Sequence, residues 1–238
     1  MLVELPNTFG EAPTNMAVDA MLLESLPPGT AVFRHYGWLE PSITFGYMQS
    51  YAEILNNDSL GELRICRRMT GGGIVDHCND WTYALVIHSE VPSAKDPANS
   101  LYESIHQAIS QALDEQSVAN RLAPCPRACG GAVIQTRTPE SCFTKPVAND
   151  VLRPDGRKIS GAAMKRTRKG LLVQGSVDRG ALPESFDYGR FQKRLLGELS
   201  KVLNLPISQN QDTSLFINNT KLEEQKGRFA SHEWLHRR

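Results

Sequence analysis

The sequence predicts an α+β fold in which strands and helices follow one another without a regular strand–helix–strand alternation. Apolar runs rich in β-branched and aromatic residues form strand-like clusters within 31–47, 81–88 and 158–177. Two further stretches, 99–113 and 191–202, instead repeat apolar residues every three or four positions, as amphipathic helices do. At 238 residues, the chain can bury about 70–75% of its unfolded surface.

The N-terminal part of the chain is expected to contain one helix and three strands. The helix is predicted over 14–26, where apolar residues fall at helical spacing behind a Thr or Asn cap. Two strands, 32–36 and 43–47, are separated by a turn containing Pro and Gly. The mostly apolar run 81–88 predicts a buried strand.

The middle of the chain is expected to contain one helix and a pair of strands. The helix is predicted over 99–113, and Ser100 and Glu103 form a capping-box pattern at its start. Strands at 158–164 and 171–177 are expected to pair around a short basic turn.

The C-terminal part is expected to be mostly helical and to belong to the same unit. A helix is predicted over 191–202, a loop over 208–219 and a short helix over 221–234. We expect a single domain over residues 1–238, with 207–238 as its terminal loop and short helix.

Charge and hydropathy argue against two classes of partner. The 26 basic and 26 acidic residues give a formal net charge of zero, whereas nucleic-acid binding is normally driven by a basic excess. No apolar run approaches the ~18 residues of a membrane span, and the N-terminus lacks the basic and apolar regions of a signal peptide. The sequence therefore predicts a cytoplasmic protein that binds neither nucleic acid nor membrane.

The cysteine pattern predicts free thiols. Five cysteines leave at least one without a disulfide partner, which indicates a reducing compartment. Cys125 and Cys129 have the spacing of half a zinc site, but no second close pair follows them. No metal site is therefore predicted.

A run of three glycines is the most conspicuous candidate for a binding site. Gly71, Gly72 and Gly73 lack Cβ atoms, so their backbone N–H groups can be presented to a ligand at close range. The arginine pair that ends at Arg68 indicates a ligand with negative charge or a polarised carbonyl. His77 follows closely enough to face the same ligand, whereas the glycines alone would be read as a flexible turn.

Lys158 and Cys142 are the predicted catalytic residues. Lys158 soon meets Gly161, where the absence of a Cβ permits close approach of the backbone. Its ammonium could stabilise charge that develops on an acyl carbonyl or a phosphate. Cys142 could act as a nucleophile if a neighbouring cation or base lowers the pKa of its thiol, and the other four cysteines are interpreted as structural.

Several motifs together carry a resemblance to a known family. The run Arg-Arg-x-Thr-Gly-Gly-Gly-x-Val-x-His-x-x-Asp-x-x-Tyr at 67–83 resembles the signature of the lipoate-protein ligase A and octanoyltransferase family. Further segments agree with that family in the same order along the chain: 15–19, 34–49, 156–161, 172–176 and, more weakly, 229–234.

The resemblance implies a mixed sheet with flanking helices, as in class II biotin and lipoyl synthetase-like catalytic domains. It implies that Lys158 contacts the carbonyl of a fatty-acyl or lipoyl group. The residues that it implies for substrate binding are Arg68, Thr70, Gly71, Gly72, Gly73, His77, Asn149 and Gly161. The acceptor would be a lysine of a lipoyl domain or of the glycine-cleavage H protein.

Two chemistries compete within this family. Octanoyltransferases of the cysteine type take the acyl group from acyl carrier protein through a thioester without a cofactor, and the segment around Cys142 resembles theirs. Lipoate ligases use ATP and Mg²⁺ to form an acyl-adenylate, and Asn149 with Asp150 resembles their Asn-Asp pair. The chain is not expected to hold the accessory domain that many ligases carry, so the sequence favours the transferase.

Two alternatives from other classes stay open at this point. A biotin ligase is disfavoured, because the glycine run departs from that family's Gly-Arg-Gly-rich loop. A catalytically silent acyl-binding protein would need neither Lys158 nor Cys142.

Overall fold

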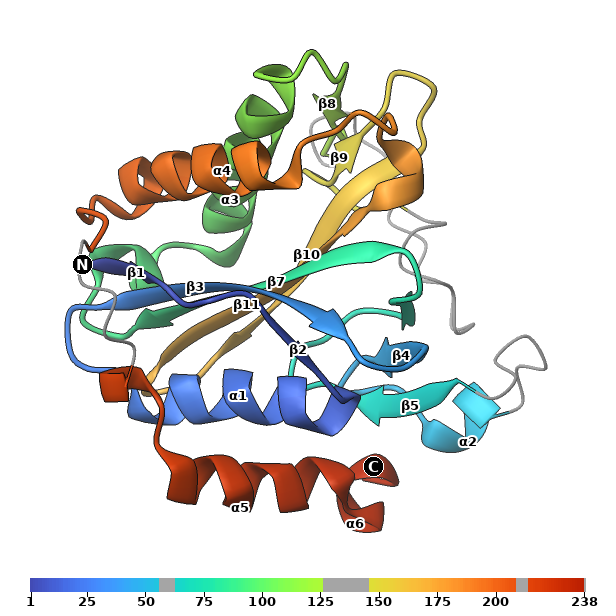
Figure 1. The fold of residues 1–238 in the computed structure, drawn as a ribbon, viewed down its shortest axis with the longest axis vertical. Coiled ribbons are helices and arrows are strands. Elements are labelled where there is room, and N and C mark those ends of the chain that lie inside the picture. The colour runs from blue at the N-terminus through green and yellow to red at the C-terminus, as the bar shows by residue number, and fades with distance from the viewer. Residues whose placement is uncertain (56–62, 126–145, 209–213, 238) are drawn as a thin grey trace.

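The computed structural model describes residues 1–55, 63–125, 146–208 and 214–237 and shows an α+β domain built on one large mixed sheet (Figure 1). The strand order is β1-β3-β7-β11-β10-β9-β8, and β2 also pairs with β3. The strands are β1 (Leu2–Glu4), β2 (Thr8–Gly10), β3 (Ala31–Trp38), β7 (Asp80–His88), β8 (Arg121–Leu122), β9 (Val151–Leu152), β10 (Lys158–Arg166) and β11 (Gly170–Asp178). The predicted fold class is confirmed.

Helices cover both faces of this sheet (Figure 1). The α-helices are α1 (Ala12–Ser25), α2 (Tyr51–Leu55), α3 (Ala98–Asp114), α4 (Tyr188–Leu203), α5 (Asn219–Ala230) and α6 (His232–Leu235). Short 3₁₀ helices lie at Pro92–Lys95, Arg179–Ala181 and Ser214–Phe216.

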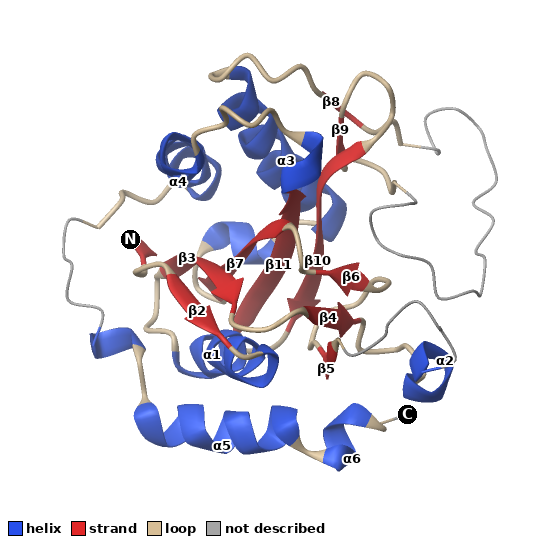
Figure 2. Ribbon diagram, turned by 45° about the vertical axis from the view of Figure 1, so that its right-hand side comes forward, coloured by secondary structure: helices blue, strands red, loops and turns tan. Residues whose placement is uncertain are grey.

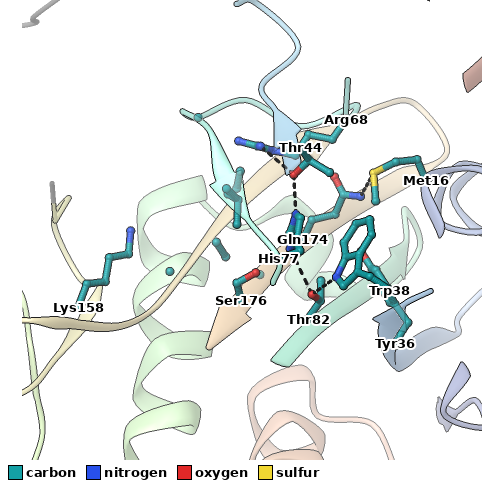
Figure 3. A pocket seen from close by; sticks show the side chains of 16 residues that line it. Met16, Tyr36, Trp38, Thr44, Arg68, His77, Thr82, Lys158, Gln174 and Ser176 are labelled. Carbon is teal, nitrogen blue, oxygen red and sulfur yellow. Dashed lines mark hydrogen bonds between the residues drawn. The ribbon is translucent and has the colours of Figure 1, made fainter. Parts of the chain in front are cut away.

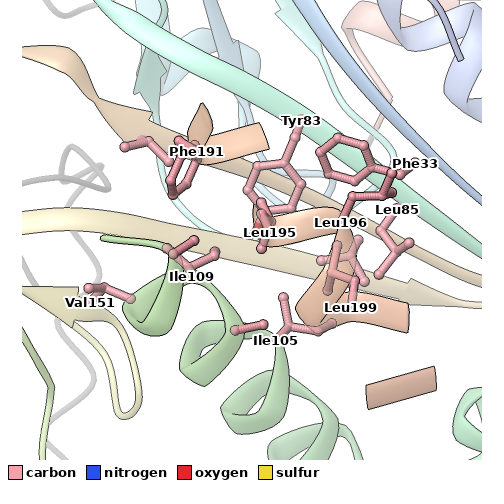
Figure 4. Packing of buried hydrophobic residues seen from close by; sticks show 14 of the residues in the cluster. Phe33, Tyr83, Leu85, Ile105, Ile109, Val151, Phe191, Leu195, Leu196 and Leu199 are labelled. Carbon is pink, nitrogen blue, oxygen red and sulfur yellow. The ribbon is translucent and has the colours of Figure 1, made fainter. Parts of the chain in front are cut away.

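Side chains that alternate along β7 show which helices pack on each face of the large sheet. Tyr83 and Leu85 are buried in the cluster formed with α3 and α4 (Figure 4). Ala84 and Val86 point to the opposite face and pack with α1 and α5. Since successive strand residues point to opposite faces, a strand segment with helices on both sides must be apolar throughout, as residues 83–87 are.

A second, three-stranded sheet lies beside the large one (Figure 2). It consists of β5 (Arg64–Arg67), β4 (Ser42–Phe45) and β6 (Val75–Asp76), in that order. The strands expected at 32–36 and 43–47 are β3 and β4, but they lie in different sheets and do not pair with each other. Both edges of β3 are already hydrogen-bonded, to β7 on one side and to β1 and β2 on the other. The chain after β3 therefore starts a new sheet.

The starts of two helices differ from the expected ones. α1 begins at Ala12 behind Glu11, with Pro in its first turn, where the fixed φ of proline suits a helix. Asn15 lies inside α1 and donates instead to the carbonyls of Gly10 and Gly37. α3 begins at Ala98 without a side-chain cap, so the predicted capping box is not formed.

The C-terminal segment is two helices where one was expected, because Ser231 ends α5 and caps α6. Arg67, at the end of β5, holds this segment in place. Its guanidinium donates to the carbonyls of Trp234 and Leu235, and the Trp234 indole donates back to the Arg67 carbonyl. In the parts of the chain that the structure describes, no helix has the length and apolar character needed to cross a membrane.

Candidate functional site

A pocket opens where the small sheet meets the large one (Figure 3). Its floor comes from residues that lie opposite one another on neighbouring strands: Thr82 opposite Tyr36, Gly161 opposite Ser176, and Ala163 opposite Gln174. The remaining lining residues are Met16, Trp38, Thr44, Arg68, Gly72, Val75, His77, Lys158, Ala162 and Gly175. This floor continues the sheet face that packs against α1, but here the chain supplies polar side chains in place of Ala84 and Val86.

Lys158 is held at one end of the pocket by a buried carboxylate. Its Nζ lies 2.8 Å from Oδ2 of Asp150, which is completely buried. Asp150 also accepts from the Val147 amide at 2.7 Å and from the Tyr102 hydroxyl at 2.5 Å. Burial, and then the nearby Asp150 charge, raise the pKa of Tyr102, so its hydroxyl stays a donor. The lysine ammonium is thus fixed in one place.

An irregularity in β10 explains why Lys158 reaches the pocket. Ser160 lies opposite Val177, which packs in the core beneath α3 and α4, and strict alternation would send Lys158 to the same side. The register against β9 shifts between Lys158 and Ser160, however, as in a β-bulge. Such an extra residue can turn a side chain towards a site.

Gly161 leaves room for this lysine rather than for a ligand alone. A Cβ at Gly161 would meet Cε of Lys158, lie 2.5 Å from its Nζ and lie 2.8 Å from Oδ1 of Asp150. The lysine side chain therefore crosses directly over the glycine. The sequence predicted a close approach at Gly161, and the structure shows that the approaching group is Lys158 itself.

We expect Gly161→Ala to reduce activity by about 10²-fold or more, because the new methyl group displaces the Lys158 ammonium. The measurement is kcat/KM in an acyl-transfer assay, together with the melting temperature. Gly197→Ala is the control, since nothing lies within 4 Å of a Cβ at that position in α4. Wild-type activity in Gly161→Ala would show that the position of Lys158 is unimportant.

The glycine loop, residues 70–73, lies across the pocket with its carbonyls turned towards the protein. The Thr70 carbonyl accepts from the Tyr47 amide at 2.8 Å. The Gly71 and Gly73 carbonyls accept from the Arg68 guanidinium at 2.6 and 2.8 Å. The Gly72 carbonyl packs so closely on Gly46 that a Cβ there would overlap it.

With the carbonyls turned inward, backbone amides remain for a ligand. Gly72 has a φ of 90°, which favours glycine, and it lines the pocket. Among the described residues, no hydrogen bond is recorded for the amide of Gly71 or Gly72. Backbone amides without protein partners are suited to an anion or a carbonyl oxygen, the ligand that the sequence predicts for this loop.

The loop is also fixed at its N-terminal end. The Thr70 hydroxyl donates to Oε1 of Gln174 at 2.8 Å, and the Gln174 amide donates in turn to the buried Asp19. Arg34 forms an ion pair with Asp19 at 3.0 Å. Thr70 therefore ties the loop to the large sheet.

His77 lies at the centre of a second polar network. Its Nδ1 is 2.7 Å from Oδ2 of Asp80, its Nε2 is 2.8 Å from Oγ1 of Thr44, and Trp38 stacks on its ring at 4.0 Å. Asp80 also accepts from the Ser176 hydroxyl at 2.5 Å and from the Thr82 hydroxyl. The imidazole is therefore fixed in one orientation.

The structure brings most of the predicted residues together. Arg68, Gly72, His77, Lys158 and Gly161 all line this one pocket. The Arg68 guanidinium donates three hydrogen bonds to the Gly71 and Gly73 carbonyls, so Arg68 stabilises the shape of the glycine loop. The predicted contact of Arg68 with the polar end of a substrate stays a prediction.

Two predicted residues lie elsewhere or outside the described chain. Asn149 occupies a turn with a φ of 68°, directly before Asp150, and its amide donates to the Ala123 carbonyl. Cys142 lies outside the described residues.

Among the cysteines of the described chain, Cys66 is buried, as expected of a structural thiol, whereas Cys78 and Cys125 are exposed and correct that expectation. Burial raises the pKa of Cys66 to about 12. Desolvation, followed by the neighbouring Asp76, raises the pKa of Cys78 to about 11. The Cys66 and Cys78 thiols therefore stay protonated near neutral pH, whereas cysteines react as thiolates. Within the described ranges, no group of three His, Cys, Asp or Glu side chains is placed to hold a metal ion.

Several pocket residues were not singled out from the sequence. Asp150 was noted only as part of an Asn-Asp pair, and its pairing with Lys158 depends on the antiparallel packing of β9 against β10. Thr44, Gln174 and Ser176 are ordinary strand residues in the sequence. A signal existed for Asp80, which stands three residues after His77 and ends up bonded to it.

Comparison with known proteins gives one family. Residues 11–195 match the model of the lipoyl protein ligase A/B catalytic domain. The chain is 27% identical over 219 residues to octanoyltransferase LipM of Halalkalibacterium halodurans, covering 87% of this chain and 78% of that protein. It is 32% identical over 173 residues to octanoyltransferase LipM of Moorella thermoacetica, covering 69% of this chain and 60% of that protein.

Two solved lipoate ligases have the same fold. The bi-partite lipoate protein ligase of Thermoplasma acidophilum superposes with a TM-score of 0.71 at 19% identity, covering 98% of this chain and 95% of that one. A lipoate-protein ligase A bound with ATP superposes with a TM-score of 0.69 at 19% identity, covering 98% and 97%. At this level of identity, the likeness shows the shared fold.

Proposed function

Because this chain belongs to the lipoyl protein ligase A/B catalytic domain family, we propose that it transfers an octanoyl or lipoyl group to a lysine of a lipoyl domain or of the glycine-cleavage H protein. The observation that carries the proposal is the pairing of two groups in one pocket. The Lys158 ammonium, fixed by Asp150, lines the same pocket as the glycine loop. Together they can hold an acyl carbonyl and its polar neighbours. The octanoyltransferase relatives favour transfer over other acyl chemistry.

In the proposed reaction, acyl carrier protein is the donor and Cys142 the nucleophile, without a cofactor. The Cys142 thiolate attacks the donor thioester, the carrier thiolate leaves and takes up a proton, and the acyl group stays on Cys142 as a new thioester. The acceptor lysine then attacks as a neutral amine. An amide forms, the C–S bond to Cys142 breaks, and the departing Cys142 thiolate takes up the proton that the amine nitrogen loses. In both steps, the Lys158 ammonium stabilises the negative charge that develops on the carbonyl oxygen.

An ATP-dependent lipoate ligase is the second candidate, and one observation favours it. Asp150 of the ligase-like Asn-Asp pair is the residue that holds Lys158. In this alternative, the Gly71 and Gly72 amides and Lys158 form a donor set that fits the phosphates of ATP with its Mg²⁺. The bound nucleotide would supply activation of a free acid as an acyl-adenylate.

A donor comparison tests the proposal. The full chain is incubated with a lipoyl domain and either octanoyl-acyl carrier protein without ATP, or octanoate with ATP and Mg²⁺. We expect modification of the lipoyl domain with the carrier donor alone, and a hydroxylamine-sensitive mass adduct on the protein. Modification and pyrophosphate release only with ATP and free acid would replace the transferase by the ligase. A saturable ligand signal without turnover on either donor would reject both.

A further inference from the structure

The glycine loop is connected to strand β7 of the large sheet through a series of buried hydrogen bonds, called here the hydrogen-bond chain. It runs from Asp80 through His77, Thr44 and Arg68 to the carbonyls of Gly71 and Gly73. Figure 3 shows its middle part, from His77 through Thr44 to Arg68. These side chains come from different parts of the fold. Asp80 lies on β7, Thr44 lies on β4, and Arg68 directly follows β5. Each is at most 9% exposed.

Asp80, at one end of this hydrogen-bond chain, determines which group donates and which accepts at each later bond. The Asp80 carboxylate only accepts, so His77 donates to it from Nδ1 at 2.7 Å. In the neutral imidazole, Nε2 must then accept, and its neighbour at 2.8 Å is the Thr44 hydroxyl, which therefore donates. The Thr44 oxygen keeps lone pairs for Arg68, whose Nη1 lies at 3.3 Å.

Asp80 can determine the direction of these hydrogen bonds because two further donors fix its carboxylate in place. The hydroxyls of Ser176 on β11 and Thr82 on β7 both donate to it, at 2.5 and 2.9 Å from Oδ2. The carboxylate is therefore fixed to the two central strands. Trp38 stacks on His77 and donates from its indole nitrogen to Thr82, which closes the network on the remaining side.

We propose that Thr44 is a positioning residue, through which the Asp80–His77 pair holds Arg68 and thereby sets the shape of the glycine loop. Thr44 joins the two halves of this hydrogen-bond chain, because its hydroxyl bonds both to His77, the partner of Asp80 on β7, and to Arg68, which holds the glycine loop. Without that hydroxyl, His77 loses a donor and Arg68 loses an acceptor, and the loop is held by fewer bonds. The inference rests on the proposed function only for the identity of the ligand that the loop receives.

The test compares Thr44→Val, which keeps the shape and loses the hydroxyl, with Thr44→Ser, which keeps the hydroxyl. Hydrogen exchange of the Tyr47 amide reports on the loop, because this amide donates to the Thr70 carbonyl at 2.8 Å. We expect exchange about tenfold faster in Thr44→Val, with wild-type rates in Thr44→Ser and in the β7 amides of both variants. Unchanged Tyr47 exchange in Thr44→Val, or equal acceleration in β7, would overturn the proposal.

A double-mutant cycle with His77→Asn gives the second measurement. The Asn amide can still donate to Asp80 but leaves Thr44 without its acceptor, so it breaks the same chain one bond earlier. We expect each single variant and the double variant to accelerate Tyr47 exchange by similar factors. Additive effects would show that Thr44 and His77 act separately and would overturn the proposal.

Kinetics separate this inference from the proposed function. In an active wild type, we expect Thr44→Val to raise KM for the acyl donor about tenfold while kcat changes less than threefold, because a misplaced loop weakens binding. A fall in kcat alone would contradict a positioning role. A wild type without transfer activity would reject the proposed function, and the exchange measurements would still decide the role of Thr44.

Discussion

Replacing Lys158 with methionine is expected to lower kcat/KM for acyl transfer by about 10²–10³-fold, the usual effect of removing one donor to a developing oxyanion. Methionine keeps much of the volume and loses the ammonium. The same change leaves the Asp150 carboxylate buried without its cation, which costs about 3–5 kcal/mol of stability. Activity and stability would therefore both fall, and the single variant cannot separate them.

A second substitution separates the two effects. In Lys158→Met/Asp150→Asn, neither charge of this ion pair remains, and the new carboxamide can still accept a hydrogen bond from Val147 or Tyr102. We expect the double variant to regain most of the lost unfolding free energy, measured by denaturant titration, while kcat/KM stays low. Recovery of activity together with stability would show that Lys158 is structural.

Replacing Cys142 with alanine is expected to lower carrier-dependent transfer by at least about 10³-fold, because the covalent intermediate can no longer form. The hydroxylamine-sensitive adduct should disappear with it. Mass spectrometry of the protein after incubation with the octanoyl donor measures the adduct, and modification of a lipoyl domain measures transfer.

Cys125→Ala is the matched control, since Cys125 is an exposed free thiol. We expect it to transfer like the wild type and to keep the adduct. If Cys142→Ala transfers as well as Cys125→Ala, Cys142 is not the nucleophile. If the protein is instead an ATP-dependent ligase, we expect Cys142→Ala to stay active, because an acyl-adenylate forms without a cysteine.

Local patterns predicted the elements that carry strong periodicity. The helix expected at 99–113 is α3, Ala98–Asp114, and the strands expected at 158–164 and 171–177 are the antiparallel pair β10 and β11. Their apolar residues recur at a spacing that only one type of element can bury. The shortest strands, such as β6 and β9, span two residues each and leave no such signal.

Pairing between distant segments was not accessible in the same way. The separation of β3 and β4 into two sheets follows from which edges of β3 are already occupied, and those partners lie far along the chain. Arg67 illustrates the same limit, because its bonds to Trp234 and Leu235 join residues more than 160 positions apart. No local pattern records such a contact.

By itself, the sequence determined the fold class, the family and the residue types of the site, because glycines, arginines and a lysine in a specific order limit the chemistry that can follow. The tertiary structure decided which partner each of these residues takes. It bonded Lys158 to Asp150 over Gly161, and it turned Arg68 to the carbonyls of the glycine loop. The physical reason is that burial requires each polar group to find a partner, and only the folded chain decides which groups are close enough to provide one.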